Sequence, residues 1–147
     1  MTSFDHLEIS LNEAPIFPVE KPDGRKGLAE ISRAVDFQRI IRMTGPSVSM
    51  FANANAGKRN PRLAQREGIK AGVFDYTLAW GCGGICFVEL KGYDKSGRPG
   101  KLSQSQIDWG NRMHRLGHKV AAFFDPIEAA RFVASCGAPM REITREA

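Results

Sequence analysis

Long hydrophobic runs are absent from the chain, because no apolar stretch approaches the roughly 20 residues that a membrane-spanning helix needs. The first residues carry acids where a signal peptide would need a basic flank and an apolar stretch. Internal repeats and low-complexity tracts are absent as well. These absences predict a cytoplasmic protein with no membrane partner.

Cysteine is scarce, and its spacing argues against metal or disulfide chemistry. Cys82, Cys86 and Cys136 are odd in number and lack the paired spacing of a zinc site or a disulfide framework. We expect them to be reduced packing residues, since buried free cysteine is common. The glycine-rich residues 81–84 also lack the following helix that a phosphate loop requires, which disfavours a nucleotide-binding protein.

The composition is that of an ordinary globular domain with an excess of basic residues. A chain of 147 residues, 42% of them hydrophobic and 25% charged, is long enough to bury one core. A formal net charge of +5 favours an anionic partner, because basic side chains that contact phosphates gain free energy from counterion release. The basic clusters are Arg25, Lys26, Arg33, Arg39 and Arg42, and then Lys58, Arg59, Arg62, Arg66 and Lys70. The alternative interpretation of each cluster is a solvated surface.

Proline and glycine divide the chain into three parts. Pro15, Pro18, Pro22 and Gly24 predict an extended N-terminal arm over residues 1–24. Residues 25–137 are expected to form a single domain, and the charged residues 138–147 a loose C-terminal tail.

Hydrophobic periodicity predicts the elements of the domain. A helix is expected from about Leu28 to Met43, with Glu30 on the same side as Phe37 and Ile41 and therefore partly buried. Strands are expected over about 48–52, 74–80, 85–91 and 119–124, and helices over 61–67, 103–116 and from 126 onward. Ser103 and Gln106 form a capping-box pattern. These elements predict an α/β fold with a mixed central β-sheet flanked by helices.

The second and third strands carry the most informative polar residues. Glu89 and Lys91 lie two positions apart and must share one face of the sheet, with Val88 and Leu90 on the other. We therefore expect one charged face and one apolar face. Asp75 lies fourteen positions before Glu89, and an antiparallel hairpin with an even index sum, near 164, puts both acids on one face.

Two carboxylates on one face repel each other, which would raise the pKa of one of them unless a cation lies between them. Oxygen ligands suit Mg²⁺ or Mn²⁺, which lower the pKa of an attacking water and withdraw charge from a phosphorus atom. Lys91 can hold that nucleophile or stabilise charge on the phosphate. The competing interpretation is structural: Asp75 marks the start of a strand, and Glu89 with Lys91 forms a surface ion pair.

Four segments, in order, resemble the VRR-NUC domain, a branch of the PD-(D/E)XK nuclease superfamily. Residues 55–59 resemble the family's Pro-Asn-Gly-Gly-x-Arg segment, 68–75 its Gly-x-x-x-Gly-x-Pro-Asp segment, 87–91 its Glu-x-Lys strand, and 102–109 its Leu-Ser-x-x-Gln-x-x-Trp helix start. Ala54 and Phe74 stand where the family has proline, which changes backbone rigidity more than chemistry.

The resemblance implies a PD-(D/E)XK core and a set of site residues. Asp75 and Glu89 would be metal ligands, with the Leu90 carbonyl as a backbone ligand and Glu30 as the first-helix acid. Lys91 would be the catalytic lysine and Gln106 an active-site helix residue, although Gln106 is also explained as a capping residue. The family's glutamine near Glu30 is replaced here by Arg33. The candidate DNA contacts are Asn55, Lys58, Arg59, Arg62 and Lys70.

The predicted function is a Mg²⁺- or Mn²⁺-dependent endonuclease that hydrolyses phosphodiester bonds in DNA. Small free-standing members of the family resemble phage proteins that act on branched DNA such as four-way junctions. A compact enzyme that cuts a symmetric junction is expected to act as a homodimer. The alternative function is a DNA-binding module of the same fold that does not cleave.

Overall fold

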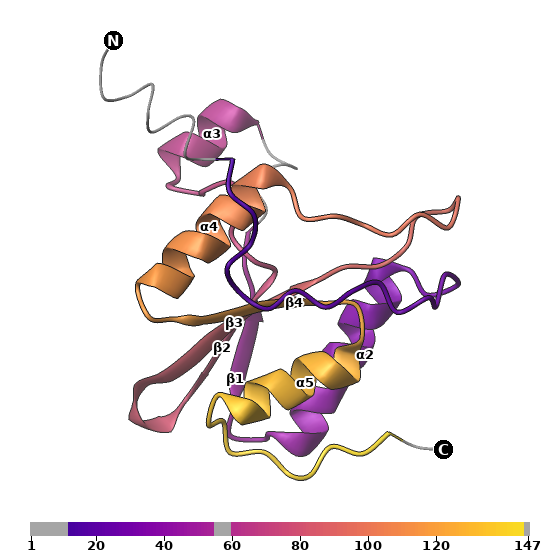
Figure 1. The fold of residues 1–147 in the computed structure, drawn as a ribbon. Helices are drawn as coiled ribbons and strands as arrows, with labels where there is room; N and C mark the ends of the chain where they lie inside the picture. Colours follow the sequence, from indigo (N-terminus) through magenta and orange to yellow (C-terminus); the bar gives the residue numbers. More distant parts are fainter. Residues whose placement is uncertain (1–11, 55–59, 146–147) are drawn as a thin grey trace.

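The structure is a computed structural model that describes residues 12–54 and 60–145. A four-stranded sheet lies between two layers of helices (Figure 1). Its strands are β1 (Ser49–Ala52), β2 (Tyr76–Trp80), β3 (Gly84–Leu90) and β4 (Lys119–Phe123), in that spatial order. The first three are antiparallel and β4 is parallel to β3, which confirms the predicted mixed sheet.

Helices cover both faces of this sheet, as the predicted α/β fold requires. Helices α2 (Glu30–Thr44) and α5 (Pro126–Ser135) pack on one face, and α4 (Gln104–Arg115) packs on the other (Figure 1). Along the chain, the short helix α3 (Pro61–Arg66) lies between β1 and β2, and the 3-10 turn η2 (Gly81–Gly83) lies between β2 and β3. Among the described residues, no helix has the length and apolar character needed to cross a bilayer.

The hairpin register agrees with the prediction. Tyr76 lies opposite Val88 and Trp80 opposite Gly84, so the index sum is the expected even value. Asp75 directly precedes the first residue of β2, and its amide donates to Glu89 Oε1 at 3.2 Å, so the two acids lie side by side at the end of the hairpin.

The expectation of one purely charged face is wrong. The Glu89 face also carries Phe87 and its β4 neighbour Val120, which pack in a second apolar cluster with Trp109 of α4. Phe74 joins that cluster instead of the Leu78 face, because β2 begins only at position 76 and the alternation does not extend before it. Each face therefore has a core, and the acids lie at the edge of the smaller one.

The described part of the N-terminal arm, residues 12–24, is extended and pairs with the sheet. The Glu20 amide donates to the Ala122 carbonyl at 2.9 Å, and the Ala122 amide donates to the Pro18 carbonyl at 3.0 Å. Phe17 is buried against Gly110 of α4, where an added Cβ would lie 2.4 Å from the ring. The arm thus covers the exposed edge of β4, which would otherwise present unpaired backbone groups.

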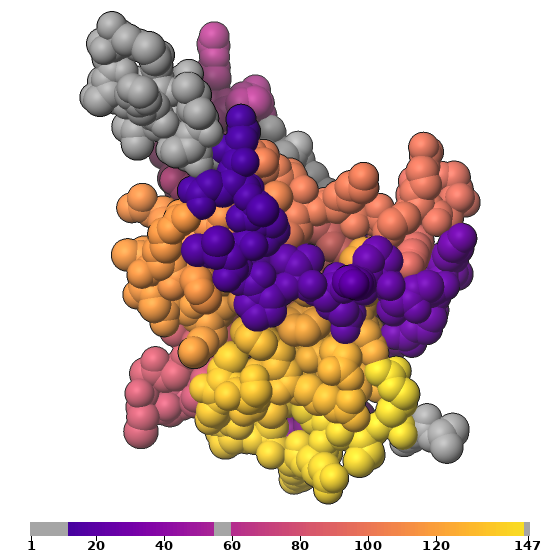
Figure 2. All heavy atoms as spheres, in the orientation of Figure 1, coloured from indigo at the N-terminus to yellow at the C-terminus, as the bar shows by residue number. Residues whose placement is uncertain are grey.

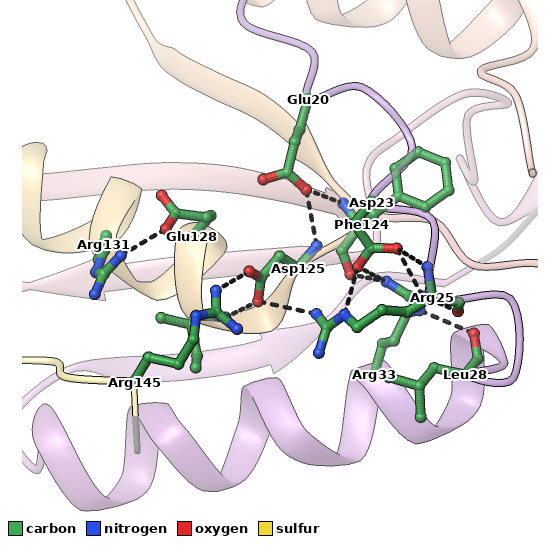
Figure 3. A network of polar contacts seen from close by, with 11 residues as sticks. Glu20, Asp23, Arg25, Leu28, Arg33, Phe124, Asp125, Glu128, Arg131 and Arg145 are labelled. Carbon is green, nitrogen blue, oxygen red and sulfur yellow. Dashed lines mark hydrogen bonds and ion pairs between the residues drawn. The ribbon is translucent and has the colours of Figure 1, made fainter. Parts of the chain in front are cut away.

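A buried arginine joins the arm to the helices on the opposite layer (Figure 3). Arg33 of α2 is 1% exposed, and its guanidinium donates to the Asp23 carboxylate and to the carbonyls of Leu28, Arg25 and Phe124. The interpretation of Arg33 as a solvated surface charge is therefore wrong. Burial alone would raise the pKa of Asp23, but hydrogen bonds from Arg33 and Arg25 lower it to about 2.

The described part of the C-terminal tail is attached to the domain, so the expectation of a loose tail is wrong for residues 138–145. The Arg141 amide donates to the Thr44 carbonyl at 2.7 Å, and Ile143 packs against the larger core. Arg145 pairs with Asp125, the N-cap of α5 (Figure 3).

All three cysteines are free thiols, as expected. Cys86 is buried in β3 and Cys136 is half-buried. Cys82 is exposed in the hairpin turn, so the packing role predicted for it is wrong.

Replacing Arg33 should destabilise the fold and should do so in a pH-dependent way. Arg33→Met removes the buried partner of Asp23 and leaves it with the exposed Arg25, which should lower the free energy of unfolding by about 3–5 kcal/mol at neutral pH. Asp23 has a depressed pKa in the folded protein, so its contribution is present above pH 3.8 and is lost as the pH falls through about 2. The difference between the variant and the wild type should shrink over that interval in urea unfolding.

Arg39→Met is the control, because Arg39 lies on the same helix but is exposed, and within residues 12–54 and 60–145 its ion pair is with Asp36. It should cost less than about 1 kcal/mol. Equal losses in the two variants would contradict a special role for the buried arginine.

Candidate active site

The two predicted acids meet at the end of the β2–β3 hairpin. Glu89 is 1% exposed, and its Oε1 accepts the Asp75 amide at 3.2 Å. The Asp75 Oδ2 in turn accepts the Leu90 amide at 3.0 Å. Each acid is therefore oriented by the backbone beside the other, and both carboxyl groups lie at the same end of the hairpin.

Lys91 and Gln106 complete the cluster. The Lys91 ammonium donates to Gln106 Oε1 at 3.1 Å and lies 3.9 Å from Glu89 Oε2. The Gln106 side-chain nitrogen, Nε2, donates to the same Glu89 oxygen at 3.2 Å. Sequence reasoning singled out all four side chains, and the structure joins them in one hydrogen-bonded group, which we call the acid–lysine cluster (Asp75, Glu89, Lys91 and Gln106).

Gln106 caps α4 and also bonds to Lys91 and Glu89. It is the N3 residue of the predicted capping box, since Ser103 Oγ accepts the Gln106 amide and Gln106 Oε1 accepts the Ser103 amide at 2.9 Å. The same Oε1 also accepts from Lys91. The first turn of α4 is therefore fastened to the site through one side chain.

Two glycines allow the elements of the site to approach each other. Gly72 has a φ of +86°, and an added Cβ would lie 2.1 Å from the Ser105 carbonyl oxygen in the first turn of α4. Gly92 follows β3, and an added Cβ there would lie 2.5 Å from the Glu30 amide at the start of α2. Both contacts are with backbone atoms, so a side chain at either position would move a helix away from the acids.

Asn53 is a site residue that sequence reasoning missed. Its amide donates to the Asp75 carbonyl at 2.8 Å, and its side-chain nitrogen donates to the Phe74 carbonyl at 2.8 Å. Its side-chain oxygen accepts from the Thr77 hydroxyl at 3.0 Å. Asn53 thus holds the backbone on both sides of Asp75. The sequence marks it only as the first residue of a polar loop, and its role follows from the pairing of β1 with β2.

The site has an electrostatic strain that a cation would relieve. Burial, and then the nearby charge of Asp75, raise the pKa of Glu89 to about 9, although Lys91 lowers it. The Leu90 carbonyl points to the same side as its amide, toward Asp75, because both groups of a strand residue face one neighbour. Two carboxylates and one carbonyl form an all-oxygen donor set, which fits Mg²⁺ or Mn²⁺.

Glu30 differs from its prediction. It is exposed at the start of α2, not partly buried. It lines a cleft of about 400 Å³ together with Asn53, Asp75 and Leu90, and its charge contributes to the raised pKa of Glu89. In residues 12–54 and 60–145, no group of three or more His, Cys, Asp or Glu side chains is arranged to hold a metal. The structure therefore brings together Asp75 and Glu89 as a pair, with Glu30 at the rim of the cleft that Asp75 lines.

The predicted DNA contacts are only partly described. Arg62 is exposed on α3, and Lys70 is exposed beside α4, where it lines a second cleft. Asn55, Lys58 and Arg59 lie outside the described residues.

Comparison of the chain with protein-family models, with curated proteins and with solved structures found no match in any of the three.

Replacing Glu89 by its neutral isostere should remove a pH dependence of stability. A pKa raised from 4.5 to about 9 means that the folded state loses stability as the pH rises between these values. The midpoint of thermal unfolding of Glu89→Gln, measured in EDTA, should equal that of the wild type near pH 4.5. It should exceed the wild-type value increasingly up to about pH 9.

Glu128→Gln, at an exposed position on α5, should show no such trend. A constant difference between Glu89→Gln and the wild type across this pH range would contradict the buried, protonated state of Glu89.

Comparing Gly72→Ala with Gly68→Ala should separate the cost of the close contact with α4 from the cost of a strained backbone. Gly68 is the matched control. Gly68 has a similar φ of +77° but no atom within 4 Å of an added Cβ. Gly68→Ala should cost about 1–2 kcal/mol in urea unfolding, from left-handed strain alone. Gly72→Ala should cost about 1–3 kcal/mol more, because the first turn of α4 must move. Equal costs would show that the packing of this segment on α4 is not tight.

Proposed function

We propose that the protein is a Mg²⁺- or Mn²⁺-dependent endodeoxyribonuclease with a PD-(D/E)XK-type core. The proposal is carried by one observation: Asp75, Glu89, Lys91 and Gln106 form a single hydrogen-bonded cluster at the end of a hairpin. A surface ion pair between Glu89 and Lys91 would not explain a glutamate that is 1% exposed with a pKa near 9. A buried acid pair beside a lysine is typical of a site that handles an anionic substrate.

The chain's own groups divide the work. Asp75, Glu89 and the Leu90 carbonyl would hold the divalent cation. When bound, that ion supplies Lewis acidity, activating a water and neutralising charge on the phosphate. This division does not use Glu30, which lines the rim of the cleft.

Lys91 is the group suited to the reacting phosphate. Its side chain is 15% exposed, and its ammonium lies 3.9 Å from Glu89 Oε2, beside the acid pair. It can donate a proton in a hydrogen bond to a non-bridging phosphate oxygen, where negative charge grows in the transition state. Gln106 accepts from Lys91 and donates to Glu89, so it holds both side chains in one orientation.

The substrate class follows from charge and from the family resemblance. A formal net charge of +5 favours a polyanion, and we propose DNA. Action as a homodimer on branched DNA such as four-way junctions is part of the proposal and rests on that resemblance. Exposed apolar side chains on α2 and on the edge strand β1, Ile31, Val35 and Phe51, offer surface that a second copy could cover.

Cleavage assays test the proposal. Labelled linear, flap and four-way DNA is incubated with purified protein, with and without Mn²⁺. The wild type should cut only with the metal, and cutting should be strongest on the branched substrates. Asp75→Asn and Lys91→Ala should each lose roughly 10²-fold or more in rate and retain most of their DNA affinity.

Lys119→Ala is the matched control, because Lys119 is an exposed lysine opposite Cys86, at the other end of β3. It should cut at nearly the wild-type rate. A wild-type protein that binds DNA without metal-dependent cleavage would reject the enzyme and favour the DNA-binding module. Equal cutting by Asp75→Asn would reject the assigned site.

A further inference from the structure

Three clefts that share lining residues lie between Asp75 and the surface of α4. The cleft of about 400 Å³ beside Glu30 shares Asn53 and Asp75 with a smaller one of about 200 Å³ at the start of α4. The smaller cleft shares Ala71 and Ser105 with a third, of about 620 Å³. We call this third cleft the α4 groove. A linear polymer whose phosphate lies at Asp75 could therefore continue into it.

Three of the ten residues that line the α4 groove are basic, and two are acidic. Arg112 and Arg115 lie one turn apart on α4, and Lys70 faces them from the segment that precedes β2. All three are exposed, and among the described residues Lys70 and Arg112 form no ion pair. Asp108 also lines the groove, but its carboxylate accepts from Gln104 at 2.9 Å. Unpaired cations beside a polyanion site are the usual means of holding a phosphate backbone.

The third basic residue of the groove, Arg115, is paired with a residue of the N-terminal arm. The Glu13 carboxylate pairs with the Arg115 guanidinium, across the side of α4 along which the arm runs (Figure 2). Both side chains are substantially exposed, 38% for Glu13 and 53% for Arg115. An exposed pair of this kind contributes little to stability, so a stronger anion can displace the carboxylate.

The arm does not depend on Glu13 for its position. Buried Asn111 of α4 accepts the Ile16 amide at 2.8 Å and donates to the Ala14 carbonyl at 3.0 Å. Phe17 is inserted against Gly110 directly after this segment. A substitution at Glu13 should therefore leave the arm docked and change only the charge next to Arg115.

We propose that the α4 groove is a DNA-backbone site, in which Lys70, Arg112 and Arg115 contact phosphates that lead away from the acid–lysine cluster. Glu13 competes with a phosphate for Arg115 and so weakens DNA binding. The substrate class rests on the proposed function, whereas the competition follows from the groove itself. The proposal predicts that removing the charge of Arg115 weakens DNA binding, whereas removing the charge of Glu13 strengthens it.

Fluorescence anisotropy with a labelled DNA duplex tests this, using the full chain in EDTA at several salt concentrations. Arg115→Gln should weaken binding by roughly 3–10-fold and reduce the salt slope by about 1, as the loss of one phosphate contact does. Glu13→Gln should tighten binding by roughly 2–5-fold, because it frees Arg115 for the phosphate. Thermal melts should confirm that both variants remain folded.

The exposed pair Glu128 and Arg131 on α5 is the matched control, with 40% and 44% exposed side chains. Glu128→Gln and Arg131→Gln make the same charge changes outside the groove and should alter affinity less than the groove variants do. Effects of Glu13→Gln and Arg115→Gln in the same direction, or no larger than those of the control pair, would overturn the proposal.

The groove and the nuclease can fail separately, because binding in EDTA needs no cleavage. Opposite effects in a protein that never cuts DNA would support the groove and reject the enzyme. Metal-dependent cutting with unchanged affinity in both variants would reject the groove and leave the enzyme standing.

Discussion

The register of the β2–β3 hairpin is the constraint on which the site depends. A slip of one residue would move one acid to the opposite face and separate the pair. The register is held by the larger core, in which Leu78, Cys86 and Val88 are all fully buried. Apolar packing on one face therefore positions Asp75 and Glu89 on the other. The fold's stability and the geometry of the candidate site have a common origin.

The same arrangement carries a cost within the site. A carboxyl group buried beside a second acid has a raised pKa, and its charged form opposes folding. The protein tolerates Glu89 because Gln106 and the Asp75 amide donate to it and because Lys91 lies beside it. Gly72 lets the first turn of α4, which carries Gln106, come close enough for Gln106 to reach Glu89. Stability is thus reduced locally where an ion and a substrate could restore it.

The arm links the two layers of the molecule. On one side Phe17 packs against α4 and the segment pairs with β4, and on the other Asp23 holds the buried Arg33 of α2. Arg33 is stabilised by a full set of acceptors and by the rings of Tyr93 and Phe124. The segment that carries Glu13 is therefore a fixed part of the domain, and it borders the α4 groove.

The sequence by itself determined the features that local pattern controls: the β2–β3 hairpin, the shared face of Glu89 and Lys91, and the capping box of Ser103 and Gln106. These follow from the two-residue strand period and from side chains that bond within one turn. Only the tertiary structure decided that Asn53 braces Asp75, that Arg33 is buried, and that the tail packs on α2. It also decided that Glu30 stays at the rim and that Phe74 belongs to the second core. Each of these depends on which distant segment arrives beside a residue, and neither periodicity nor composition carries that information.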